Sequence, residues 1–119
     1  MKILAKEDSK ELEEALDSSE LVLFLLTGQP GSIAETIHNA IEPTLEPRRK
    51  IFLIEDLSIF PPEKIIQWFG AMDCMDCFAV LSKKDKKVVS KGPTKDLMPG
   101  PDKIQSRLIR KLFIEAEKQ

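Results

Sequence analysis

Six apolar residues, Leu-Val-Leu-Phe-Leu-Leu, follow one another without interruption at positions 21–26. Successive side chains of a β-strand point to opposite faces of its sheet, so a strand without a polar position has to be covered on both faces. A shorter apolar run from Ile51 to Ile54 has the same character and ends at two acidic residues. We expect the two runs to be adjacent, central, parallel strands of an α/β fold.

Amphipathic segments separate these runs. Apolar spacing near 3.6 residues predicts four helices, at residues 9–18, 33–41, 62–72 and 103–116, and assigns Ile33 and Ile66 to the apolar faces of the second and third. Ser32 and Glu35 form a capping box before the second helix, and Asp102 is expected to cap the last. The segments 78–81 and 87–90, joined by a polar turn, predict a β-hairpin. The predicted order is αβαβαββα, with residues 1–119 as a single domain.

This order, a βαβ unit followed by ββα, resembles the thioredoxin fold over nearly the whole chain. The resemblance implies a central mixed β-sheet with helices on both faces. Where that family has a Cys-Gly-Pro-Cys turn, this chain has Gln29-Pro30-Gly31-Ser32, and Cys77 stands where the family has a cis-proline. Gly92 matches the glycine that closes the family's hairpin. Because an amide and a hydroxyl supply no thiolate, the resemblance argues against dithiol exchange at this turn.

The turn at residues 27–32 also imitates the start of a phosphate-binding loop, because two glycines follow a buried strand and precede a helix. A phosphate-binding loop continues with a lysine and a hydroxyl residue, whereas this chain continues Ile33-Ala34-Glu35. We therefore interpret Ser32 as a helix cap rather than a nucleophile. A recognition loop at this edge of the sheet stays open as an alternative.

A Cys-x-x-Cys pair, Cys74 and Cys77, lies between the third helix and the hairpin. This spacing can hold a disulfide or supply half of a zinc site. Zinc would need two further ligands, and the only histidine, His38, lies in another segment, so we predict no cofactor and no metal; a metal shared between subunits stays open. Asp73 and Asp76 raise the pKa of neighbouring thiols, which favours two ordinary reduced cysteines.

Three further features of the sequence could have a catalytic or binding role. His38 has no partner in sequence for acid–base catalysis, and we interpret it as a surface or capping residue. Glu55 and Asp56 follow the second strand and are interpreted as a solvated turn. Trp68 lies beside the apolar stripe of its helix, where the edge of the core is favoured over a binding platform.

Charge is distributed unevenly along the chain. The net charge is −2, which argues against a dedicated nucleic-acid binder. Residues 81–119 nevertheless carry eleven basic and five acidic side chains, so either this part is a solvated surface or it contacts an anionic partner. No apolar run is long enough to span a membrane, and two cysteines without an export signal suggest a cytoplasmic protein.

No catalytic constellation is visible, and the leading hypothesis is a redox-inactive thioredoxin-like adaptor that binds a protein or an extended peptide. The exposed backbone of the first turn could then hydrogen-bond the peptide. By resemblance, the binding residues are Gly28, Gln29, Pro30, Gly31, Ser32, Asp76 and Cys77. The alternative is an atypical thiol-disulfide oxidoreductase that uses Cys74 and Cys77 as catalytic residues.

Overall fold

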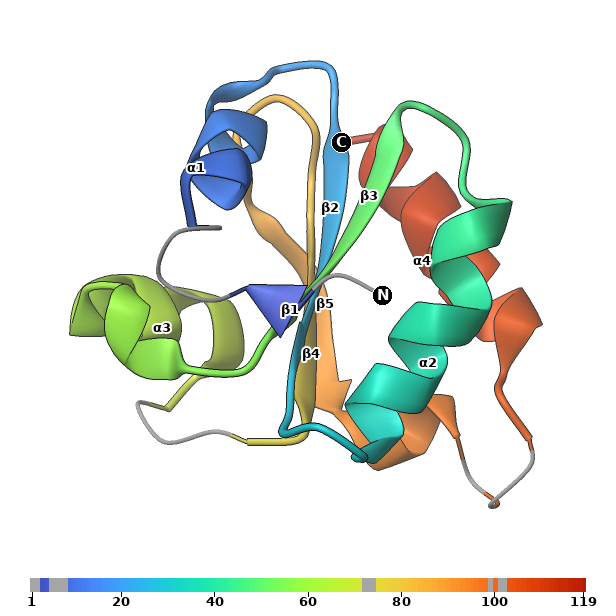
Figure 1. Ribbon diagram of the computed structural model, residues 1–119. Helices are drawn as coiled ribbons and strands as arrows, with labels where there is room; N and C mark the ends of the chain where they lie inside the picture. The colour runs from blue at the N-terminus through green and yellow to red at the C-terminus, as the bar shows by residue number, and fades with distance from the viewer. Residues whose placement is uncertain (1–2, 5–8, 72–74, 99, 101–102) are drawn as a thin grey trace.

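The computed structural model describes residues 3–4, 9–71, 75–98, 100 and 103–119 (Figure 1). Its strands are β1 (Ile3–Leu4), β2 (Val22–Thr27), β3 (Arg49–Ile54), β4 (Cys77–Leu81) and β5 (Val88–Pro93). The α-helices are α1 (Ser9–Asp17), α2 (Ile33–Ile41), α3 (Pro62–Phe69) and α4 (Ser106–Glu117), and short 3₁₀ helices are η2 (Glu42–Thr44), η3 (Leu57–Ile59) and η4 (Thr94–Leu97). No helix in these ranges is long and apolar enough to cross a membrane.

The five strands form one mixed sheet in the order β1-β3-β2-β4-β5. β2 and β3 are parallel neighbours, with Phe24 opposite Ile51, as the two apolar runs predicted. β4 runs antiparallel to β2 on its other side, and β5 pairs antiparallel with β4 as a hairpin. The α/β prediction with a thioredoxin-like arrangement of strands and helices is therefore confirmed.

Helices cover both faces of the sheet, with α1 and α3 on one side and α2 and α4 on the other (Figure 1). Alternate residues of β2 enter two separate cores. Phe24 and Leu26 pack in the core that contains residues of α2 and α4, whereas Leu23 and Leu25 pack in the core that contains residues of α1 and α3. Two-sided burial is the physical reason for six apolar residues in succession.

The boundaries differ from the sequence-based expectations in a few places. β1 was not predicted, because two residues carry no readable periodicity, and it pairs in parallel with the end of β3. α4 begins at Ser106 rather than directly after residue 102, so Ile104 lies before the helix and packs against the core. Ile66 was assigned to the buried face of α3 but is exposed. The expected helical positions Asp8, Met72 and Asp102 lie outside the described residues.

The tip of the β4–β5 hairpin is tied to the α1–β2 connection. Lys86 has a φ of 53°, and its Nζ donates hydrogen bonds to the carbonyls of Ser18, Leu21 and Lys83. Burial lowers the pKa of Lys86. The tip thus lies at the end of β4 that is remote from Cys77, and the exposed Lys84 is a suitable position for control substitutions.

Candidate functional site

The turn between β2 and α2 is closed by its own hydrogen bonds. Ser32 is the N-cap of α2, and its Oγ accepts a hydrogen bond from the Glu35 amide at 3.4 Å. In return, the Glu35 carboxylate accepts one from the Gly31 amide at 3.2 Å. The role of Ser32 as a cap is confirmed, whereas the return bond of the predicted capping box reaches the Gly31 amide, because the Ser32 amide donates to the Gln29 carbonyl. Because a carboxylate already occupies the positive end of α2, the turn is poorly suited to hold a phosphate.

Gly28 is buried where β2 meets the turn. A Cβ atom at this position would lie 2.5 Å from Ser32 Oγ and 2.8 Å from Ala34 Cβ, so the close approach of strand and helix requires a residue without a side chain. Its amide donates to the Ile54 carbonyl. Gly28 therefore has a structural role at the buried base of the turn. Neither its amide nor the Gly31 amide is available to a peptide, because both donate hydrogen bonds within the protein.

Gln29 and Pro30 form the exposed crest of the turn. The Gln29 side-chain amide donates to the Glu55 carbonyl at 3.2 Å, which joins the crest to the end of β3. Gly31 has a φ of 83°, in the region that favours glycine. The Gln29 side chain therefore holds the crest in place beside the end of β3.

The second predicted segment, Asp76 and Cys77, meets the end of β2. Thr27 Oγ1 accepts a hydrogen bond from the Cys77 amide at 2.9 Å and donates one to the Cys77 carbonyl, linking residues that lie 50 positions apart. Asp76 has a φ of 56°, and its carbonyl accepts from the Thr94 amide at 2.7 Å. The structure therefore brings the two predicted segments together, and η4 lies beside them.

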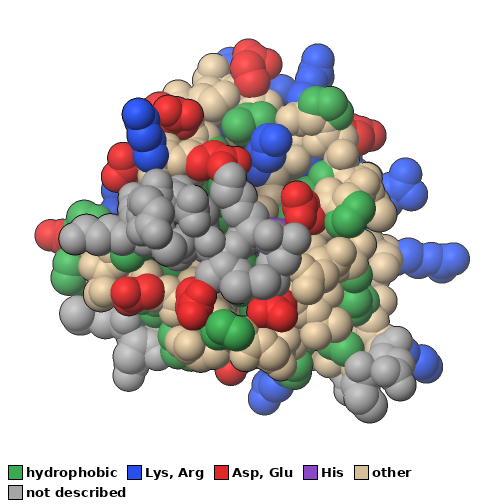
Figure 2. Space-filling view, viewed as in Figure 1, with side chains coloured by type: hydrophobic (Ala, Val, Ile, Leu, Met, Phe, Trp, Pro, Cys, Tyr) green, Lys and Arg blue, Asp and Glu red, His purple; other side chains and the backbone are tan. Residues whose placement is uncertain are grey.

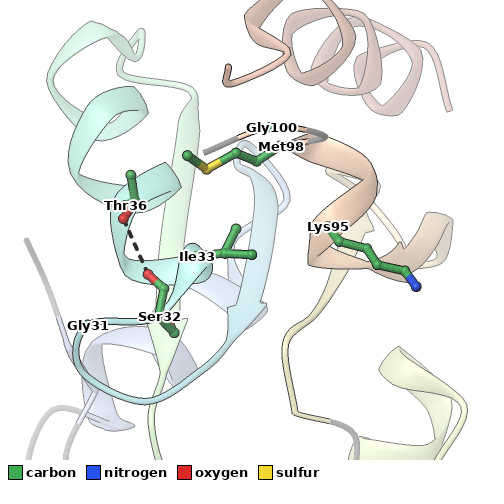
Figure 3. A pocket seen from close by; sticks show the side chains of 7 residues that line it. All are labelled: Gly31, Ser32, Ile33, Thr36, Lys95, Met98 and Gly100. Carbon is green, nitrogen blue, oxygen red and sulfur yellow. Dashed lines mark hydrogen bonds between the residues drawn. The ribbon is translucent and has the colours of Figure 1, made fainter. Parts of the chain in front are cut away.

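A groove runs along these segments, which we call the α2 groove. It consists of two hollows of about 500 and 600 Å³ that share Gly31, Ser32, Ile33 and Lys95. One end is completed by Thr36, Met98 and Gly100 (Figure 3), and the other by Met75, Asp76 and Pro93. In Figure 3 the Ile33 side chain lies between α2 and η4, while Lys95 extends away from it.

Several groove residues were not predicted as functional. Ile33 was assigned to the apolar face of α2, but it is 40% exposed because it occupies the first turn, beyond the edge of the sheet. Met75 is 39% exposed. Lys95 belongs to η4 and Met98 follows directly after it, in a segment whose position beside α2 depends on the hairpin. Among these residues, only Met75 could have been singled out from the sequence, because it lies between the two cysteines of the Cys-x-x-Cys pair.

Cys77 takes part in a disulfide bond, and Cys74, the only other cysteine in the sequence, lies outside the described residues. The interpretation of two separate reduced thiols is therefore wrong for Cys77; the spacing had left a disulfide open. Within the described ranges, no three His, Cys, Asp or Glu side chains are grouped so that they could hold a metal ion. A disulfide-bonded Cys77 also supplies no thiolate ligand.

His38 is completely buried, so its interpretation as a surface or capping residue is wrong. It lies on the face of α2 that packs toward β3, and neither ring nitrogen has a hydrogen-bond partner among the residues that the structure describes. Burial lowers the pKa of His38, while the Glu42 carboxylate and the Ile51 backbone, which is near the ring but outside normal hydrogen-bond geometry, oppose this shift. We therefore interpret His38 as a neutral imidazole that fills space in the core.

The remaining candidates have structural roles. Trp68 is 1% exposed and makes edge-on contacts with the rings of Phe60 and Phe69, which confirms a core position over a binding platform. Asp56 caps η3, and hydrogen bonds from the Ser58 hydroxyl and amide lower the pKa of its carboxyl. The solvated turn expected after β3 is confirmed for this residue.

No protein-family model matches the chain, and a comparison with curated proteins finds no match. The candidate site is therefore defined by geometry alone. That geometry consists of a hydrogen-bonded turn, a disulfide-bonded cysteine and a groove with apolar walls, at the edge of the sheet where β2 ends.

Proposed function

We propose that this chain is a thioredoxin-like binding module that holds an extended segment of a partner protein in the α2 groove. The observation that supports it most is the exposure of apolar side chains. Ile33 and Met75 are two of the four large apolar residues that are exposed in the described part of the chain, and both line this groove. Exposed apolar surface that gathers in a hollow is typical of interaction sites.

The polar groups around the groove support binding rather than turnover. The Ser32 hydroxyl is engaged as a helix cap, and Gln29 is bonded to the backbone of β3, so neither residue is an activated nucleophile. The amides of Gly28 and Gly31 are used within the protein. Affinity would thus come from apolar side chains of the partner, with Lys95 and Asp76 adding charge selectivity.

Affinity capture from the native lysate tests this function when a matched control is included. Ile33→Glu places a charge in the groove, whereas Ile66→Glu places the same charge on α3 at a position that is 47% exposed. A partner of the groove is captured by the wild-type protein and by Ile66→Glu, but not by Ile33→Glu. Equal capture by all three proteins would contradict the proposal.

A second pair of variants examines the crest of the turn. Gln29→Lys adds charge beside the groove without altering the core, and Lys84→Glu alters the remote hairpin tip. With the purified partner, we expect weaker binding for Gln29→Lys alone. If only Lys84→Glu weakens the complex, the basic C-terminal part of the chain is the interface and the groove assignment is wrong.

The disulfide bond of Cys77 favours one other function, thiol-disulfide exchange with a dithiol partner. In that exchange the Cys77 disulfide is reduced to two thiols while the partner's two thiols are oxidised to a disulfide. A glutathione redox titration that follows alkylation of Cys74 and Cys77 distinguishes the two functions. Reversible exchange within the range of cellular thiol pools supports the oxidoreductase, whereas a disulfide that resists reduction there supports the binding module.

A further inference from the structure

Helix α4 presents a row of cationic side chains to solvent. Residues at spacings of three, four, seven and eleven share one face of a helix, within about 100° of arc at 3.6 residues per turn. On α4 these positions are all exposed, and we call them the α4 stripe: Arg107, Arg110, Lys111, Ile114 and Lys118. Ile114 is 40% exposed in the middle of the four cations.

The cations of the α4 stripe have no ion-pair partner within the described part of the chain. The acidic residues of α4 lie outside the stripe, and Glu117 is engaged by Arg49 of β3, whose Nε donates to its carboxylate at 2.9 Å. Figure 2 shows Lys and Arg side chains projecting from the right-hand edge of the molecule, the side on which Figure 1 places α4. This face is therefore positively charged although the whole chain has a net charge of −2.

A hollow of about 380 Å³ adjoins the stripe, between α4 and the C-terminal end of α2. Arg110 lines the hollow and also belongs to the stripe. The apolar part of its lining comes from both helices and the segment after η2: Ala40, Ile41, Leu45, Ile109 and Phe113. The polar part of the lining comes from Arg49, which is already paired with Glu117, and from Thr44, Glu46 and Ser106. An apolar side chain of a partner could enter here while neighbouring groups contact the cations.

Two classes of anionic surface fit this face poorly. A membrane-bound helix inserts its apolar face, but the apolar face of α4, which includes Ile109, Leu112 and Phe113, is buried in the core. The sequence-independent part of nucleic-acid affinity grows with the number of phosphates that a protein neutralises, and the stripe offers only four cations.

We propose that the α4 stripe and its adjoining hollow form a second docking surface, which binds an acidic polypeptide segment. Carboxylates of the segment pair with Arg107, Arg110 and Lys111, and one apolar side chain enters the hollow. This surface is separate from the α2 groove, because the groove lies at the N-terminal end of α2 and the hollow at its C-terminal end. The proposal therefore does not depend on the proposed function.

Fluorescence anisotropy with defined probes tests the proposal on the full chain. The first probe is a short fluorescein-labelled peptide in which one leucine lies between two pairs of glutamates. Two matched peptides replace the leucine by serine or the glutamates by glutamine, and single-stranded oligothymidylate of the same net charge serves as the nucleic-acid probe. We expect the glutamate–leucine peptide to bind most tightly, with an affinity that falls as salt is added.

Variants of the protein distinguish the contribution of the stripe cations to peptide binding from the contribution of the hollow. Arg107→Glu combined with Arg110→Glu should weaken peptide binding at least about tenfold, whereas Lys84→Glu combined with Lys87→Glu, which changes the net charge equally, should leave it nearly unchanged. Ala40→Leu fills the hollow from an exposed position of α2. In that variant the peptides with leucine and with serine should bind equally.

Several outcomes would overturn the proposal. Equal weakening by both charge-reversal pairs indicates non-specific attraction, and tighter binding of oligothymidylate indicates a nucleic-acid surface. Absence of peptide binding, or binding that is insensitive to Ala40→Leu, excludes an anchor in the hollow. If sedimentation without peptide shows self-association that Arg107→Glu with Arg110→Glu abolishes, a second copy of the chain occupies the surface instead.

Discussion

The two ends of helix α2 carry surfaces of opposite character. At its N-terminal end, the α2 groove exposes Ile33 and Met75 while the polar groups of the turn bond one another. At its C-terminal end, the hollow beside α4 is lined in part by Arg110, one of four stripe cations that have no ion-pair partner among the described residues. If both proposals hold, one small domain offers two contacts, of which the first would select a partner by shape and apolar contact and the second mainly by charge.

The largest expected effect concerns the floor of the groove. Gly28→Ala should lower the free energy of unfolding by about 1–3 kcal/mol, because the added Cβ overlaps Ser32 Oγ and Ala34 Cβ. Urea denaturation measures the loss. Gly100→Ala is the control, since apart from its chain neighbours no heavy atom of the described residues lies within 4 Å of its added Cβ, and it should change stability by less than about 0.5 kcal/mol. Equal stability of both variants would contradict the close packing described for Gly28.

The cap of α2 should have the next largest effect. Ser32→Ala should cost about 0.5–2 kcal/mol, because the Glu35 amide loses its acceptor, whereas Ser32→Asp should largely keep the stability. Thermal unfolding of the three proteins provides the measurement. A normal melting midpoint for Ser32→Ala would count against the cap and would reopen a chemical role for the hydroxyl.

Between the two surfaces lies the buried His38, which should make stability depend on pH. Burial lowers its pKa in the folded protein below the ordinary value of 6.5, so the unfolded chain binds the proton more readily. The free energy of unfolding should therefore fall as pH drops below about 6.5, and fall no further for this group below its folded-state pKa.

His38→Leu provides the matched comparison for this pH dependence. The apolar side chain cannot titrate and leaves no unpaired ring nitrogen in the core. Its stability relative to the wild-type protein should rise as the pH is lowered through this window, as measured by urea midpoints at several pH values. A constant difference between the two proteins at all pH values would show that His38 does not titrate during unfolding.

The smallest expected effect on stability belongs to the wall of the groove. Ile33→Ser should change the free energy of unfolding by less than about 0.5 kcal/mol, because the side chain is already half in solvent. It should nevertheless weaken binding of a groove partner. A large loss of stability would mean that Ile33 belongs to the core, and the contrast between the two ends of α2 would then be reduced.

Local sequence patterns predicted the structure correctly where a pattern is compatible with only one local structure. The run at residues 21–26 predicted a strand covered on both faces, and Ser32 with Glu35 predicted the start of α2, because each depends on groups that are close in sequence. Helical periodicity was less informative at the ends of helices. Ile33 and Ile66 fit the apolar spacing but are exposed, because the neighbouring elements do not extend over them.

The candidate site was predicted only in part, because its segments come from three parts of the chain. The resemblance to thioredoxin placed the turn at 28–32 beside Asp76 and Cys77, and the hydrogen bonds of Thr27 to Cys77 join the two segments. No sequence pattern indicated Lys95 or Met98, since their position beside α2 is set by the path of the chain after β5. The hollow under α4 was missed for the same reason.

The sequence alone was enough to predict the four α-helices, the strands other than β1, the cap of α2 and the region where positive charge gathers, because these properties arise from neighbours along the chain. Only the tertiary structure decided that His38 is buried, that Ile33 and Met75 share a groove, and that Arg110 borders a hollow. Burial and cavity shape depend on which elements pack together across the sheet. That packing is set by long-range contacts, which leave little trace in the residues around any one position.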